Sequence, residues 1–457
     1  MSKRKRKKRE AVNFDVLQQI QPHAAGIDVG AEEVYVCVPP GRDEEQIRQF
    51  ATFTSDLHEL AAWLVGCGVE TVAMESTGVY WVPLFDILES HGLEVCLVNA
   101  RHLKNVAGRK SDVADCEWLY QLHTYGLLRG SFHPPDEIRT LRVLARQREM
   151  LVRYRSAHIQ HMQKALEQMN LKLNYVLSDI TGVTGMAIIR DILAGEHNPE
   201  RLAQHRNQRC KYSEEEIAKA LTGNYRREQL FTLGQAVALY DHYGQQIAAV
   251  DVELAKLYAT MDPPDDSLPS TMPPQPRRSK PRKNQANFDL ATSLYQISGV
   301  DLTQIDGIDA LTAQVILTEV GHDVRKWPTV KHFTSWLGLC PNNAITGGKV
   351  KRRGRKKTDS RVTAALRVAA QSLARSQAAL GAFYRRIKAR HGAPKANVAT
   401  AHKLARIIYY MLKQRVDYQD PGAEQYDEQQ RQRAVRRLQK QAAKLGFTVQ
   451  PALPAHA

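Results

Sequence analysis

Apolar and polar residues alternate in the first part of this 457-residue chain. Residues 24–38 predict two strands joined by a tight turn through Gly30, and residues 46–53 predict a third strand. An amphipathic helix is expected at 56–68, with Ser55 as its cap and a glycine at its end. The chain therefore begins its folded part with three short strands and a helix.

Two strand–helix units follow. The apolar run at 69–76 predicts a strand that ends in Glu75, and 77–92 predicts a helix. Residues 93–100 predict a last strand, and a helix begins in the stretch 108–122. Three antiparallel strands followed by two crossover units is the order of the ribonuclease-H-like α/β fold, which we expect here.

The spacing of apolar residues changes to alternating threes and fours beyond about residue 138. Such heptad seams predict two long helices that pack on each other or on a second subunit. The seam residues are Ile159, Met162, Leu166, Met169 and Leu173 in one helix, and Tyr240, Tyr243, Ile247, Val250, Leu254 and Leu257 in the other.

Composition then divides the chain into six segments. We expect a basic disordered arm, an α/β catalytic domain, a helical coiled-coil region with an insert at 176–229, a proline-rich linker, a mostly helical C-terminal domain and a charged helical tail. Their expected bounds are 1–21, 22–137, 138–260, 261–289, 290–417 and 418–457.

The chain is strongly basic, with 64 Lys and Arg against 48 Asp and Glu and a formal charge of +16. A polyanion is therefore the first expected partner. The N-terminal run MSKRKRKKRE has no apolar stretch after it, so we interpret it as an arm for nucleic acid rather than a signal peptide or anchor. A solubilising tail is the alternative. No apolar run approaches the roughly 20 residues that a membrane span needs.

The six cysteines are scattered and form no CxxC pair. Three of them, at positions 37, 67 and 96, lie in apolar surroundings. We therefore expect reduced cysteines in a cytoplasmic protein, and neither zinc ligands nor disulfides.

Four acids occupy positions that the expected fold would bring together. Asp28 lies within an apolar strand, Glu75 ends another, and Asp112 and Asp115 lie one helical turn apart after the last strand. In this fold the first and fourth strands are neighbours and the last helix packs across their ends. Four clustered carboxylates cannot all stay ionised without cations.

The expected cations are two Mg²⁺ (or Mn²⁺) ions about 4 Å apart, which clamp a phosphodiester during cleavage. Arg109 and Lys110 would then contact phosphates of the nucleic acid. The alternative is structural: Asp112 and Asp115 favour the helix dipole, Asp28 lies in a turn and Glu75 caps the next segment.

The motifs GIDVG (26–30), MESTGVYW (74–81) and KSDVADCEWL (110–119) resemble the RuvC-like DEDD domain of insertion-sequence transposases. The stretch SWLGLCPNNAITGGKV (335–350) and the helical segments after it resemble the serine-bearing C-terminal domain of the same family, to which the DNA invertase Piv is related. The resemblance spans about residues 22–415. It assigns the catalytic acids to Asp28, Glu75, Asp112 and Asp115.

The resemblance also implies an activity and partners. The implied activity is that of a cytoplasmic, nucleoid-associated DNA recombinase. The implied partners are a structured bridge RNA that selects donor and target DNA, and further copies of the chain. They would form a dimer or tetramer in which one subunit's acids meet another's nucleophile.

The sequence departs from the family pattern at two positions. Thr346, in ITGGK, stands where the family has its serine nucleophile, and we expect Thr346 to take that role, with Ser360 as the alternative. Asp309, in DGID, stands where the family has a glycine. The segment around it is therefore either a phosphate-binding hairpin or a plain helix connector. Cations expected to contact phosphates follow Thr346, namely Lys349, Lys351, Arg352, Arg353, Arg355, Lys356 and Lys357.

Three functions remain open from the residues. The first is a DNA transposase or recombinase, the second is a metal-dependent nuclease of the junction-resolvase kind, and the third is a decayed transposase that only binds nucleic acid. A covalent protein–DNA adduct would separate the first from the second, and metal-dependent cleavage would exclude the third.

Overall fold

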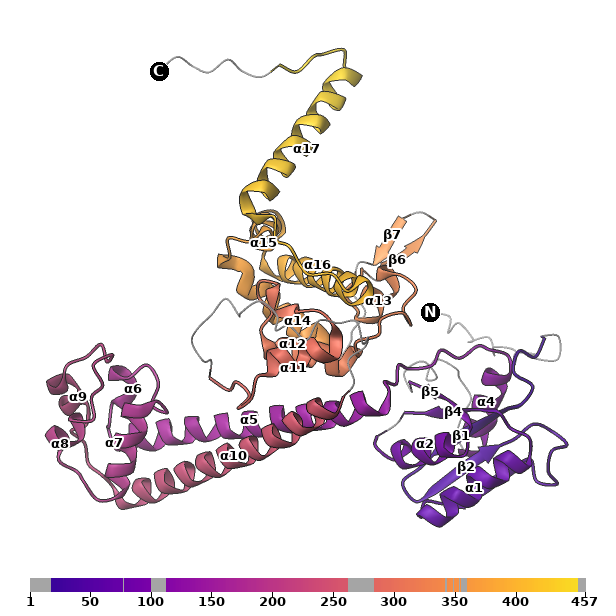
Figure 1. The fold of residues 1–457 in the computed structure, drawn as a ribbon, viewed down its shortest axis with the longest axis horizontal. Coiled ribbons are helices and arrows are strands. Elements are labelled where there is room, and N and C mark those ends of the chain that lie inside the picture. The colour runs from indigo at the N-terminus through magenta and orange to yellow at the C-terminus, as the bar shows by residue number, and fades with distance from the viewer. Residues whose placement is uncertain are drawn as a thin grey trace, which may run out of the picture. The chain divides into compact units, whose positions relative to one another are not determined.

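The computed structural model of this protein (Figure 1) forms two compact units, residues 1–133 and 134–457. The residues that it describes are 18–76, 78–99, 112–261, 283–341, 343–347, 349–352, 354 and 360–450. Most of the expected basic arm (1–17), most of the proline-rich stretch (262–282) and the cations Arg109, Lys110, Arg353, Arg355, Lys356 and Lys357 lie outside them.

The N-terminal unit contains a five-stranded sheet in the order β3-β2-β1-β4-β5. Strand β1 is antiparallel to β2 and parallel to β4, β2 is antiparallel to β3, and β4 is parallel to β5. This is the ribonuclease-H-like arrangement expected from the sequence. The strands are β1 (Ala24–Val29), β2 (Glu33–Cys37), β3 (Ile47–Ala51), β4 (Thr71–Glu75) and β5 (Glu94–Val98).

Helices cover both faces of this sheet. Helices α1 (Thr54–Gly66) and α2 (Trp81–Ser90) share a core with one face, to which Ile27 and Met74 contribute. Helix α4 (Asp112–Thr124) packs on the other face. Because successive strand residues point to opposite faces, the neighbours of Ile27 and Met74 point toward α4.

Two local predictions for these helices were wrong. Helix α1 has Phe53 at its N-cap position and begins at Thr54, so Ser55 lies in the first turn and is not the cap. Helix α2 begins at Trp81, later than the residue 77 expected from the sequence. Gly78, Val79 and Tyr80 form a turn instead, because Gly78 has a φ of +62°, outside the helical region.

The second unit is built around two long helices, α5 (Asp136–Gln168) and α10 (Arg227–Thr260), which lie side by side in Figure 1. The start of α5 shares a core with the end of α10, and the end of α5 shares another with the start of α10, so the pair is antiparallel. Ile247 and Leu254 are buried in this arrangement. Of the two possibilities that the heptad seams left open, the helices thus pack on each other within one chain.

Short helices close the far end of this pair and share the core that contains Met162 and Leu233. They form most of the insert expected at 176–229. The prediction that Leu173 continues the first seam helix was wrong, because α5 ends at Gln168 and Leu173 begins α6. Their bounds are α6 (Leu173–Val176), α7 (Val183–Leu193), α8 (Pro199–Ala203) and α9 (Glu214–Ala220).

The near end of the pair packs against the mostly helical C-terminal part of the chain, in a core that includes Ile138, Leu141 and Tyr409. One short hairpin interrupts the helices. The elements are α11 (Leu290–Ser298), η1 (Leu302–Gln304), α12 (Ala310–Val320), α13 (Val330–Trp336), β6 (Ala344–Thr346), β7 (Lys349–Arg352), α14 (Arg361–Ser372), η2 (Leu373–Arg375), α15 (Ala379–His391), α16 (Ala393–Gln414) and α17 (Gly422–Lys444).

All six cysteines are free thiols, and Cys37, Cys67 and Cys116 are buried. Burial raises the pKa of the Cys37 thiol to about 12, so this thiol stays protonated near neutral pH. Within the described part of the chain, no helix is both long enough and apolar enough to cross a membrane.

Candidate active site

Asp28 and Glu75 lie next to each other at the carboxyl ends of two parallel strands. The register of β1 and β4 pairs Gly26 with Ala73 and Ile27 with Met74, so the next residues along the two strands are Asp28 and Glu75. Both are half-buried. By strand alternation, both side chains are on the face that α4 covers.

Helix α4 rests directly on the backbone of β1. A methyl group added to Gly26 would lie 2.3 Å from the carbonyl oxygen of Cys116 and 2.2 Å from the amide nitrogen of Tyr120. Only glycine permits this approach. It brings the first turns of α4 over the strand that carries Asp28.

The same packing brings Asp115 to this edge of the sheet. Leu119 of α4 is in contact with Ala73 and with Val98, which pairs with Glu75 in the sheet. Asp115 precedes Leu119 by one helical turn, so the two share a helix face. Asp115 is half-buried. Three of the four predicted acids thus lie on the same side of the sheet, on three different elements.

The pKa of the Cys116 thiol responds to negative charge at this edge of the sheet. Its pKa is raised to about 12, mainly by burial and then by the negative charge of Asp28. Asp28 is therefore close enough to the first turns of α4 for its charge to affect them. We name Asp28, Glu75 and Asp115 the acidic edge.

The fourth predicted acid, Asp112, is the first residue of α4, and its side chain lies outside the described set. Asp112 and Asp115 are three residues apart, so helix geometry places them on neighbouring positions of one face. Among the described side chains, no group of three His, Cys, Asp or Glu residues is arranged to hold a metal ion.

The donor chemistry of the acidic edge nevertheless suits a hard divalent cation. Its ligands are carboxylates, which Mg²⁺ prefers, and none is a thiolate or an imidazole. Parallel strands and a helix hold them, so they are fixed by the core rather than by a loop. Asp28, Glu75, Asp115 and Asp112 are the residues that would hold the ion.

The predicted nucleophile, Thr346, is the last residue of β6, and its side chain is exposed. It pairs across the β6–β7 hairpin with Lys349, and Gly347 between them has a φ of +55°. Lys349 and Lys351 are exposed as well. The hairpin thus presents a hydroxyl and two ammonium groups to the solvent.

The alternative nucleophile, Ser360, has a structural task. It is the N-cap of α14, where its hydroxyl accepts a hydrogen bond of 3.3 Å from the Thr363 amide. Asp309 likewise caps α12 and accepts hydrogen bonds from the Thr312 amide and hydroxyl at 2.9 and 2.7 Å. A capping carboxylate at Asp309 favours the helix connector over a phosphate-binding hairpin.

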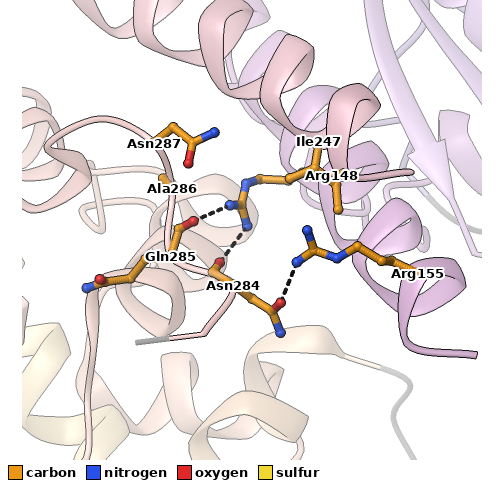
Figure 2. A pocket seen from close by; sticks show the side chains of 8 residues that line it. Arg148, Arg155, Ile247, Asn284, Gln285, Ala286 and Asn287 are labelled. Atoms are coloured by element: carbon orange, nitrogen blue, oxygen red, sulfur yellow. Dashed lines mark hydrogen bonds between the residues drawn. The ribbon is translucent and has the colours of Figure 1, made fainter. Parts of the chain in front are cut away.

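One polar site was missed from the sequence. Arg148 of α5 and Asp251 of α10 form a buried ion pair with N–O distances of 2.5 and 3.2 Å. Arg148 also donates to the carbonyl oxygens of Asn284 and Gln285, beside a cavity of about 330 Å³ (Figure 2). The end of the expected linker is therefore fixed to the helix pair.

A pattern in the sequence does point to this ion pair. Leu141, Leu144, Arg148 and Leu151 are spaced 3-4-3, so Arg148 occupies a position of the apolar seam. A charged residue at such a position predicts a buried partner of opposite charge.

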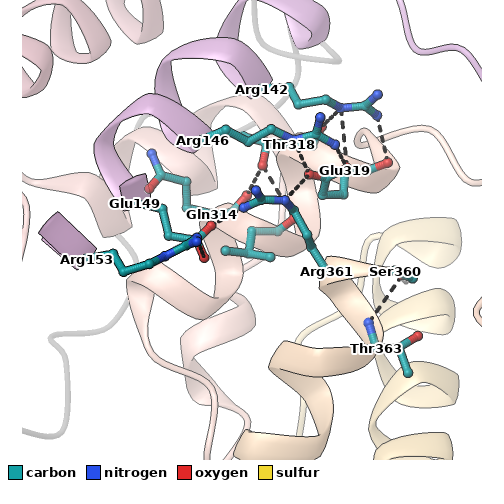
Figure 3. A network of polar contacts seen from close by, with 11 residues as sticks. Arg142, Arg146, Glu149, Arg153, Gln314, Thr318, Glu319, Ser360, Arg361 and Thr363 are labelled. Atoms are coloured by element: carbon teal, nitrogen blue, oxygen red, sulfur yellow. Dashed lines mark hydrogen bonds and ion pairs between the residues drawn. The ribbon is translucent and has the colours of Figure 1, made fainter. Parts of the chain in front are cut away.

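A second missed cluster surrounds Glu319 of α12 (Figure 3). The Glu319 carboxylate accepts two hydrogen bonds of 2.8 Å from Arg146 and lies within 3.5 Å of Arg142. It also lies 4.0 Å from Arg361, the first residue of α14, which pairs with Glu149. These contacts join α5 to the helix that follows the Thr346 hairpin and the basic loop.

Comparison with known proteins agrees with this architecture. Residues 25–171 match the family model DEDD_Tnp_IS110, described as a transposase, and residues 301–385 match the model of the IS116/IS110/IS902 transposase family. The first match contains Asp28, Glu75, Asp112 and Asp115, and the second contains Thr346.

A relative from Pseudomonas aeruginosa strain PAO1, named "Probable family 20 transposase", is 28% identical over 126 residues. This match covers 26% of the present chain and 37% of the relative, so it compares only part of each protein. The two family models match in sequence order and together span about half of the chain. The protein belongs to the IS110/IS116/IS902 family of transposases.

Proposed function

We propose that this protein is a DNA transposase that cleaves and exchanges strands with divalent metal at the acidic edge. The observation that supports the proposal is that Asp28 and Glu75 lie at the ends of neighbouring parallel strands and that α4, which carries Asp115, packs on the same face of the sheet. Carboxylates gathered in a chain of charge +16 suit an enzyme that attracts a polyanion and then acts on its phosphates.

The acids and the cations of the chain have different roles in the proposed reaction. The four acids would hold Mg²⁺ or Mn²⁺, which supplies charge stabilisation to the phosphorane-like transition state. Lys349, Lys351 and Arg352, together with Arg109, Lys110, Arg353, Arg355, Lys356 and Lys357, would contact phosphates and position the strand. Such contacts give affinity without reading bases.

Thr346 is the proposed nucleophile. Its hydroxyl oxygen forms a bond to phosphorus while the bond from phosphorus to one deoxyribose oxygen breaks. The hydroxyl proton passes to a carboxylate of another subunit's acidic edge, and the released deoxyribose oxygen takes a proton from water. The exposed end of the hairpin leaves room for a DNA strand. A covalent threonine–DNA intermediate results, and a second strand's hydroxyl resolves it.

The proposal includes three partners. These are donor and target DNA, a structured bridge RNA that selects them, and further copies of the chain in a dimer or tetramer, all in the bacterial cytoplasm. Support for the RNA and the assembly comes from the family resemblance. Sequencing of RNA that copurifies with the protein from cells carrying the intact element tests the guide, because a discrete RNA from the element's flank is expected.

The substitution Asp28→Asn tests the acidic edge. It removes one charge at almost constant volume, so strand cleavage in Mg²⁺ should be lost while DNA affinity is kept or rises. The matched control is Glu59→Gln, which removes an exposed carboxylate from α1, on the opposite face of the same sheet. Full cleavage by Asp28→Asn would contradict the proposal.

A further inference from the structure

Three apolar side chains are exposed just beyond the acidic edge. Val79, Tyr80 and Val82 lie between the end of β4 and the first turn of α2, with 71%, 52% and 40% of their surfaces accessible. Single exposed apolar residues are common on protein surfaces. Three within four positions next to a candidate site instead indicate a binding surface.

The local backbone turns Tyr80 outward. Gly78 has a φ of +62°, and a methyl group there would lie 3.4 Å from two ring carbons of Tyr80. The amide of Val82 donates to the carbonyl oxygen of Val79 at 3.2 Å, which closes a turn around Tyr80. The next residue, Trp81, instead packs against Phe85 in the core.

This turn is tied to the end of the strand that carries Glu75. The amide and the hydroxyl of Ser76 both donate to the carbonyl oxygen of Val98, at 2.9 and 3.1 Å. Four residues lie between Glu75, which ends β4, and Tyr80, which is the N-cap of α2. Tyr80 therefore lies close to Glu75 along the chain.

The chemistry of this position suits a nucleobase. The carboxylates of the acidic edge repel phosphates that no cation neutralises, whereas a base is uncharged and has a flat π surface. An aromatic ring beside the site offers a sequence-tolerant stacking partner for such a base. Val79 and Val82 would flank the stacked base with apolar surface.

We propose that Tyr80 stacks on a base of the DNA strand next to the phosphodiester held at the acidic edge, and that it thereby positions that phosphodiester. Tyr80 is a positioning residue, since it does not touch the reacting atoms. The inference rests on the proposed function, because it requires DNA at the acidic edge.

Photo-cross-linking tests the stacking without any cleavage. The probe is single-stranded oligothymidylate of about 20 nucleotides, long enough for one binding site, with iodouracil at alternate positions. Iodouracil cross-links to aromatic rings stacked on it. The full-length protein is irradiated with this probe in Ca²⁺, which carboxylates also bind, and the cross-linked peptides are identified by mass spectrometry.

A cross-link in the peptide that contains Tyr80 is expected. Tyr80→Phe should keep the cross-link and the affinity, whereas Tyr80→Ala should lose the cross-link and bind the probe roughly ten-fold more weakly. The control Tyr175→Ala removes another exposed tyrosine, from α6, and should change neither.

Three results would overturn the inference. If DNA is bound and cleaved but Tyr80 is not cross-linked, the stacking role is wrong and the proposed function stands. If the wild type binds no DNA in any metal condition, the proposed function falls and the stacking role with it. Equal loss from Tyr80→Phe and Tyr80→Ala would also exclude stacking, because phenylalanine keeps the ring.

Discussion

Gly26 of β1 faces Tyr120 of α4 so closely that a methyl group on Gly26 would lie 2.2 Å from the Tyr120 amide nitrogen. Backbone on both sides of this contact leaves no flexible side chain that can move away. The contact fixes how far α4 stands from the sheet, and therefore where Asp115 lies relative to Asp28 and Glu75.

Gly26→Ala should consequently displace α4 and disable the acidic edge. We expect a loss of about 2–3 kcal/mol in the free energy of unfolding, in the range of overpacked core sites, and a loss of metal-dependent cleavage. Urea unfolding and a cleavage assay measure the two effects. Gly66→Ala is the control, because a methyl group at Gly66, the last residue of α1, has open space and should be neutral or slightly stabilising. Wild-type cleavage by Gly26→Ala would show that α4 can shift without consequence.

The buried pair of Arg148 and Asp251 should be essential for the long helix pair. Asp251→Asn leaves the Arg148 guanidinium buried without its counter-charge, so a loss of about 3–5 kcal/mol in the free energy of unfolding is expected. The segment at 284–287 should also lose its anchor and become accessible to protease, since Arg148 and Asp251 both bind it.

Glu253→Gln is the control for that pair, since it weakens an exposed ion pair with Lys256 on α10, the helix that also carries Asp251. It should cost at most about 1 kcal/mol. Equal losses of stability in Glu253→Gln and Asp251→Asn would mean that burial adds nothing to the Arg148 pair.

His123 should make the N-terminal unit sensitive to acid. Burial lowers its pKa from 6.5 to about 4, and its Nε2 lies 2.9 Å from the Thr71 hydroxyl. Between pH 6.5 and pH 4, His123 is protonated in the unfolded chain but not in the folded chain. Stability is therefore full above pH 6.5 and falls as the pH drops toward 4, by up to about 3 kcal/mol.

Urea unfolding followed by tryptophan fluorescence at several pH values between 4 and 7 measures this slope. His123→Gln, which keeps a partner for Thr71, should flatten it. His242→Gln changes an exposed histidine of α10 and should leave the slope unaltered. A slope that persists in His123→Gln would assign the acid sensitivity to other groups.

The choice between Thr346 and Ser360 can be made with variants that respect the cap. Thr346→Ala should form no covalent adduct on nicked DNA that traps the intermediate, whereas Thr346→Ser should match or exceed the wild type, because serine lacks the methyl group that crowds the attack. Denaturing gels of labelled DNA detect the adduct.

Ser360→Ala would also remove the N-cap of α14, at a cost of about 1 kcal/mol, and would confuse the comparison. Ser360→Asp is the better variant, because it removes the hydroxyl but keeps a capping oxygen. It should still form the adduct. An adduct that survives Thr346→Ala and disappears in Ser360→Asp would reassign the nucleophile, and no adduct from any variant would favour a nuclease or a decayed enzyme.

The sequence alone determined the order of the elements in the N-terminal unit and the positions of its acids. The apolar runs of β1 and β4 and the apolar spacing of α1 are local signals, because each can be read from the residues of its own element. For the same reason Asp28 stood out, as a carboxylate within an apolar strand. The resemblance carried by 26–30, 74–81 and 110–119 then supplied the family, which the comparisons confirmed.

Other features depended on contacts between residues far apart in the sequence. The heptad seams fit a partner helix in the same chain or in another subunit equally well, and only the shared cores of α5 and α10 decided between them. Ser55 has the right residue type for a cap, but the chain's path from β3 starts α1 earlier. The closeness of Gly26 to Tyr120, the partner of Arg148 and the outward position of Tyr80 are also tertiary facts. Each depends on which other element packs next to the residue. The spacing of apolar residues within one element carries no information about that neighbour.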